Sequence, residues 1–128
     1  MGIRPVWDND EKTIVRHIYD GRWTLEDYYN LIGEHRIMLK DVDHTVDIIN
    51  DLRTAGPVPG GMAQAIKYAA RNAPPNEGVN VIVGANEYVK ALIELVNRTA
   101  GTDVTEVTHV ATLEEAYAII AEHRASRV

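Results

Sequence analysis

The chain has 128 residues, and its 45% hydrophobic and 25% charged content is ordinary for one globular domain. Its formal net charge of −6, without a local cluster of basic residues, disfavours binding to nucleic acid or to anionic membranes. The sequence has no cysteine, which excludes disulfides, thiolate metal ligands and a cysteine nucleophile.

The distribution of apolar residues along the chain indicates whether the protein is inserted in a membrane or secreted. No apolar run approaches the roughly 20 residues that span a bilayer, and the first residues lack the apolar stretch of a secretory signal. We therefore expect a single domain over residues 1–128, located in the cytoplasm and not inserted in a membrane.

The first predicted elements are two short strands and a helix. Residues 4–7 and 13–19 are typical of β-strands and flank a polar turn, which predicts a hairpin. A helix is predicted over 25–40, with Thr24 as its N-cap. Trp23 is expected to pack at its start, as a plug or as a hydrophobic staple. The core-facing stripe of this helix is formed by Leu25, Tyr28, Ile32, His35 and Leu39.

Three further strand and helix units follow. The strands are predicted over 46–52, 79–84 and 105–111. The helices are predicted over 62–72, after Asn86, and after Thr112, which stands three residues before Glu115 at capping-box spacing. Gly101 is expected to end the helix that begins after Asn86.

This order predicts an α/β fold with a mainly parallel sheet of about five strands, right-handed crossovers and four helices. The first strand is expected at the edge. If strands adjacent in sequence are neighbours in the sheet, all four helices lie on one face and the opposite face is partly open. Val79, Val81 and Val83 are then expected to face the helices. The partly open face would carry Asn80, Ile82, Asp47, Ile49 and Asp51.

Asp51 is the strongest candidate among the carboxylates, because open α/β sheets often bind ligands at the carboxyl ends of central strands. We interpret it as an acceptor for the amides of the loop that begins at Arg53, rather than as a general acid or base. The Gly60-Gly61 pair lacks a phosphate-loop continuation and is interpreted as a tight turn.

The histidines give no metal or catalytic signature. His17, His35, His44, His109 and His123 include no close pair at ligand spacing, so we expect structural roles and no metal or cofactor. His17 and His109 lie on predicted strands, and only their joint appearance beside a carboxylate would favour proton transfer. The one serine, Ser126, lies near the end of the chain. We therefore predict no catalytic residues.

The order of elements resembles the STAS domain, the SpoIIAA-like fold, over almost the whole chain. The stretch Thr-Val-Asp-Ile-Ile-Asn-Asp-Leu-Arg at 45–53 is similar to the central STAS strand, and Gly60-Gly61-Met62 falls where that family begins its second helix. The Trp23-Thr24 pair before the first helix is similar to a bacterial STAS/SEC14-like branch. The resemblance implies regulation or lipid handling.

The chain departs from this family at the family's phosphorylation site. STAS antagonists of anti-sigma factors carry a phosphorylated serine at the start of the second helix, but residues 57–62 contain no hydroxyl. Thr54 is the nearest phosphoacceptor candidate, and its place at the exit of the strand disfavours a phospho-switch.

Two functional hypotheses remain from the sequence. The first is a non-enzymatic interaction module that binds a protein partner or a second copy of itself. Its contact surface would comprise Asp51, Arg53, Thr54, Pro57, Pro59, Gly60, Gly61 and Met62. The alternative is a carrier of a small apolar ligand or lipid, with a cavity between helices and sheet lined by Met38, Met62, Ile66 and Ile93. An enzyme using Asp51 and a histidine is a distant third.

Overall fold

The computed structural model describes residues 2–99 and 107–127. Its strands are β1 Gly2–Trp7, β2 Ile14–Gly21, β3 Val46–Ala55, β4 Glu77–Val83 and β5 Val107–Val110. Its helices are α1 Leu25–Lys40, α2 Met62–Arg71, α3 Glu87–Thr99 and α4 Leu113–Ser126. Residues 105 and 106 of the last predicted strand, and Gly101, lie outside the described residues.

The strands form one sheet in the order β1-β2-β3-β4-β5. Edge strand β1 is antiparallel to β2, and each later pair is parallel. The predicted α/β fold class, with five strands in a mainly parallel sheet and four helices, is therefore confirmed. Among the described residues, no helix combines the length and the apolar character needed to cross a bilayer.

Two helices begin with capping boxes: the one at Thr112 was predicted as such, and at Thr24 the sequence predicted the N-cap alone. Thr24 Oγ1 accepts a hydrogen bond from the Asp27 amide at 3.0 Å, and the Asp27 carboxylate accepts one from the Thr24 amide at 2.9 Å. Thr112 and Glu115 make the same exchange at the start of α4. These bonds satisfy amides that a helix N-terminus otherwise leaves unpaired, so each helix begins at a residue that the sequence specifies.

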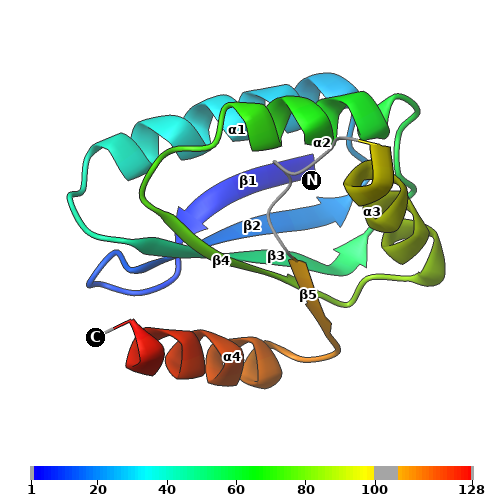
Figure 1. The fold of residues 1–128 in the computed structure, drawn as a ribbon. Helices are drawn as coiled ribbons and strands as arrows, with labels where there is room; N and C mark the ends of the chain where they lie inside the picture. Colours follow the sequence, from blue (N-terminus) through cyan, green and yellow to red (C-terminus); the bar gives the residue numbers. More distant parts are fainter. Residues whose placement is uncertain (1, 100–106, 128) are drawn as a thin grey trace.

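The helices are divided between the two faces of the sheet, which corrects the expectation that all four share one face. Helices α1, α2 and α3 cover one face, and α4 covers the other (Figure 1). The right-handed crossover rule places the three helices that connect parallel strands on a common face. Helix α4 follows β5 and does not connect two parallel strands of this sheet, so the crossover rule does not determine its side.

The position of α4 also corrects the predicted direction of the side chains on β4. Val81, Val83 and Ile49 pack against Ala116 and Ile120 of α4. Asn80 and Ile82, which were expected on the partly open face, point instead toward the three-helix face and line a pocket there. Alternation along a strand defines two sides, but it does not say which helices cover each side.

Asp47 anchors the end of α4 to the sheet. Its carboxylate is fully buried and accepts hydrogen bonds from the Val79 amide at 2.9 Å and from Arg124 Nε at 3.1 Å. Arg127 is ion-paired to the same carboxylate. Gly78 is required beside it, since a Cβ there would collide with the Asp47 carboxylate. We call Asp47, Arg124 and Arg127 the Asp47 cluster.

The Asp47 cluster also determines how Asp47 titrates. Burial alone raises the pKa of the Asp47 carboxyl, but hydrogen bonds from Arg127, the Val79 amide and Arg124 outweigh it, and the pKa is lowered. A carboxyl with a lowered pKa stabilises the folded protein above its unfolded pKa of about 3.9. That contribution is lost as the pH falls through the folded value.

Replacing Asp47 with asparagine is expected to lower the free energy of unfolding by about 2–3 kcal/mol, because buried hydrogen bonds to a charged group are lost. Chemical denaturation at pH 7, followed by circular dichroism, measures this change. The control is Asp43→Asn in the exposed loop before β3, which is expected to change stability by less than about 0.5 kcal/mol. Equal stability of Asp47→Asn and the unaltered protein would contradict the anchoring role.

Candidate functional site

A pocket of about 140 Å³ lies between the sheet and the helices α1, α2 and α3. We call it the helix-side pocket. Met62, Ile66 and Ile93, three of the four residues expected to line a cavity, do line it. The fourth, Met38, packs instead beside Leu39 and Val46 on another part of the core.

The alanine content of α2 explains why space remains under this helix. Ala69 and Ala70 of α2, and Ala73 just after its end, line the pocket with short side chains. Helix α2 packs against α1 and α3, so its height above the sheet is held from both sides. Protein interiors are otherwise close-packed, and an apolar space of this size therefore calls for an explanation.

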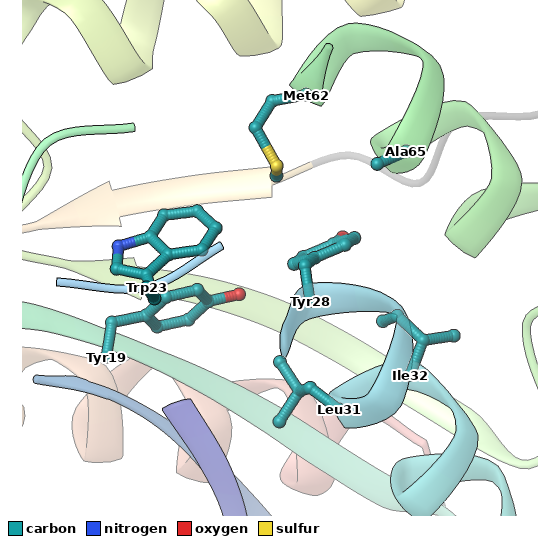
Figure 2. Close-up of a cluster of buried hydrophobic side chains, with 7 residues drawn as sticks. All are labelled: Tyr19, Trp23, Tyr28, Leu31, Ile32, Met62 and Ala65. Carbon is teal, nitrogen blue, oxygen red and sulfur yellow. The ribbon is translucent and has the colours of Figure 1, made fainter. Parts of the chain in front are cut away.

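An aromatic cluster closes one end of the pocket. The rings of Tyr19 and Trp23 meet edge to face with centroids 5.2 Å apart, and Tyr28 lies 6.4 Å from Trp23. Trp23 precedes the N-cap of α1 and Tyr28 is the fourth residue of that helix, which is the spacing of a hydrophobic staple. Figure 2 shows Met62 extending from α2 toward these rings.

The phenol groups of this cluster are held in their neutral form. Burial is the main cause that raises the pKa of Tyr19 and of Tyr28, and the charge of Glu77 adds to the effect on Tyr28. Both residues line the pocket, and their hydroxyls keep their protons at physiological pH. Trp23 Nε1 is buried and has no acceptor among the residues that the structure describes.

A continuous series of hydrogen-bonded polar side chains crosses the floor of the pocket. Glu77 Oε2 lies 2.6 Å from His35 Nε2, and His35 Nδ1 lies 3.0 Å from His17 Nε2. His17 is also hydrogen-bonded to the Asn50 side chain. Asn50 Nδ2 in turn donates to Asn80 Oδ1. We call these five residues the polar chain, and all five line the pocket.

The direction of the hydrogen bonds in the polar chain follows from one backbone carbonyl. Asn50 Nδ2 also lies 3.4 Å from the Val81 carbonyl oxygen, which can only accept. Asn50 Oδ1 is therefore the atom left to accept from His17, so the other nitrogen of His17, Nε2, accepts from His35 Nδ1–H. His35 Nε2 then forms the hydrogen bond with Glu77 Oε2.

His17 is held neutral by its surroundings. Burial, and then the neighbouring His35, lower the pKa of His17 to about 3, although the hydrogen bond to Asn50 acts in the opposite direction. The two imidazole rings are nearly perpendicular, with centroids 4.8 Å apart. A neutral His17 accepts a hydrogen bond from His35 on one nitrogen and donates one to Asn50 from the other. It therefore connects the two residues without placing a charge in the pocket.

The residues of the predicted contact surface lie in different parts of the structure. Asp51 lies on the α4 face, where Arg53 donates to it at 2.8 and 2.9 Å and Arg16 lies 3.6 Å away. The Arg53 amide also donates to Asp51 at 3.2 Å, which confirms the interpretation of Asp51 as an acceptor for this loop. Hydrogen bonds from Arg53, more than any other cause, lower the pKa of the Asp51 carboxyl.

The other residues of that surface lie around Trp23. Pro57 and Pro59 line hollows beside it, and Thr54 Oγ1 donates to the Tyr19 carbonyl at 3.3 Å. Gly60 is exposed, and Gly61 has a φ of 84° just before α2. Met62 points into the helix-side pocket. Thr54 is thus already engaged by the backbone of β2.

The sequence did not predict that His35, Glu77 and Asn80 meet. His17 and His109 do share a sheet face, but three strand spacings of about 4.8 Å separate them, or roughly 14 Å. The partner of His17 comes instead from α1. A signal was present, since His35 stands in an apolar helical stripe and Asn80 interrupts an apolar strand.

Comparisons with known proteins leave the family open. No protein-family model matches the chain, and no curated protein matches it. Within the described residues, no group of histidine, aspartate and glutamate side chains could hold a metal ion. The helix-side pocket and the polar chain are therefore the features on which a function can be argued.

The lowered pKa of His17 predicts a specific acid sensitivity. Between pH 6.5 and about 3 the unfolded chain binds a proton at His17 that the folded protein does not, so stability falls as the pH falls. The slope for one group is about 1.4 kcal/mol per pH unit. Urea titrations at pH 7.0 and 5.5 are expected to show a smaller loss for His17→Gln than for the unaltered protein.

The control for this measurement is His44→Gln, because His44 is exposed and is not part of the polar chain. Its loss of stability between the two pH values is expected to match that of the unaltered protein. An identical loss in His17→Gln would contradict the burial of a neutral His17.

Proposed function

We propose that this protein binds a small, mostly apolar molecule in the helix-side pocket, and that it does so without catalysing a reaction. The observation that carries this proposal is the combination of an apolar pocket with a fully connected polar chain across its floor. Ligand sites are typically apolar cavities with a few polar groups that orient the ligand.

The energetics of the empty protein support the same conclusion. An unfilled apolar space forfeits dispersion contacts, and such cavities lower stability in proportion to their volume. Burying the two imidazoles of His17 and His35 adds a desolvation cost that their hydrogen bonds only partly offset. A ligand that fills the space restores the missing contacts, and its polar group can use the chain that is already in place.

The size of the pocket favours a compact ligand over a lipid. An apolar cavity of about 150 Å³ holds benzene, whereas sites for larger ligands run to several hundred cubic ångströms. The pocket of about 140 Å³ belongs to the first class. Of the two ligand types in the carrier hypothesis, the small apolar molecule is therefore the better fit.

The interaction-module hypothesis is linked to the same pocket by residues that the two regions share, Met62 and Val58 among them. Val58, in the loop between β3 and α2, lines the helix-side pocket and both hollows beside Trp23. A ligand in the pocket would contact this loop from below while a protein partner contacted it from outside. The two hypotheses are compatible if a STAS-like interaction module responds to a ligand bound in the pocket. We propose a cytoplasmic location for this protein.

Ligand binding is tested by filling the pocket from the protein side. Benzene and indole are expected to raise the melting temperature of the unaltered protein by several degrees, because a ligand at 100 times its Kd adds about 2.7 kcal/mol. Ala69→Leu places a larger side chain in the pocket and is expected to abolish this shift. Differential scanning fluorimetry measures the shift, and native mass spectrometry detects retained small molecules.

The matched control is Ala91→Leu, the same change at an exposed position of α3 that does not line the pocket. It is expected to keep the ligand-induced shift. The proposal fails if neither compound shifts the unaltered protein and its native spectra show only bare chain, or if Ala69→Leu responds as strongly as Ala91→Leu.

A further inference from the structure

The direction of the polar chain determines which polar group a ligand in the helix-side pocket can carry. This inference rests on the proposed function and concerns the same pocket. It begins from Asn50 Nδ2, which faces two acceptors, Asn80 Oδ1 and the Val81 carbonyl. The backbone carbonyl cannot donate, so the orientation of the Asn50 amide is fixed.

Asn80 is the free end of the chain. Its oxygen is used by Asn50, which leaves its Nδ2 group with two N–H bonds. Asn80 lines the pocket, and no acceptor within residues 2–99 and 107–127 contacts its Nδ2. A partly exposed donor at the floor of an apolar pocket is satisfied only by water or by an acceptor on a ligand.

The opposite end of the chain is engaged at Glu77 Oε2. Its partner there is His35 Nε2. His17 uses both of its nitrogens within the chain. Among the atoms of the polar chain, the free donor at the pocket floor is therefore Asn80 Nδ2, and neither nitrogen of His17 is left to accept from a ligand.

The charge of the ligand follows from the same arrangement. Arg36, the arginine among the residues that line the pocket, is exposed to solvent, and the apolar walls would desolvate an ion without replacing its hydration. An ammonium group would in addition meet the N–H bonds of Asn80, which repel it. A neutral oxygen acceptor avoids both penalties and completes the hydrogen bonding of Asn80.

We propose that the helix-side pocket selects a neutral carbonyl compound, a ketone or ester with a ring-sized apolar body, and that Asn80 is the residue that determines this specificity. The carbonyl oxygen accepts from Asn80 Nδ2, while the apolar body occupies the space beneath the alanines of α2. The aromatic rings of Trp23 and Tyr28 form the wall at one end.

The test compares two compounds of the same shape, acetophenone and isopropylbenzene, which differ in the carbonyl oxygen. Their Kd values are measured by NMR titration for the unaltered protein and for Asn80→Leu. The ratio of the two Kd values is expected to shift against acetophenone by about 3- to 10-fold in Asn80→Leu, because one neutral hydrogen bond is lost. Comparing ratios cancels the different hydration of the two compounds.

Two further variants complete the design. Asn80→Asp keeps an oxygen for Asn50 but replaces the free donor with an acceptor, so it is expected to lose the preference for acetophenone even if Asn80→Leu does not fold. Asn97→Leu makes the asparagine-to-leucine change at an exposed position of α3 and is expected to keep the ratio of the unaltered protein.

The outcomes separate this inference from the proposed function. If both compounds bind and the ratio is the same in the unaltered protein, Asn80→Leu and Asn80→Asp, the assignment of Asn80 is overturned while the pocket remains a ligand site. If neither compound binds the unaltered protein, the proposed function is overturned and this inference with it.

Discussion

The hydrogen bond between His17 and His35 is the interaction on which the three-helix face depends. It joins the centre of α1 to β2 in a place where both imidazoles are almost fully buried. Glu77 extends the connection from α1 to β4, and Asn50 extends it to β3. A buried polar group without its partner costs free energy, so these elements are held in one relative position, and the height of α1 above the sheet follows from it.

The two faces of the sheet are stabilised in different ways. On the α4 face, β-branched and alanine side chains pack closely, and Asp47 is the buried charge that holds the end of the helix. The opposite face holds a pocket and a polar chain where a filled core would be more stable. Buried apolar clusters lie on both faces, and the three-helix face has in addition features that folding alone does not require.

Local patterns in the sequence predicted the elements well, because helical stripes and capping boxes depend on neighbours within one turn. Thr24 and Thr112 are the clearest cases. The side taken by α4 was not predictable, since the crossover rule governs only helices between parallel strands. The polar chain was missed for another reason: His17 and Glu77 approach His35 from positions 18 and 42 residues away, and spacing rules for motifs do not extend to such contacts.

The position of Val58 gives the two functional hypotheses one physical basis. Its side chain separates the helix-side pocket from the outer surface of the loop between β3 and α2, so what fills the pocket determines what Val58 packs against. If occupancy changes the conformation of the loop, it changes the affinity for any partner that binds there. Linkage then requires that the partner change the affinity for the ligand by the same factor. Ligand binding in the pocket and partner binding to the loop above it would then be thermodynamically coupled.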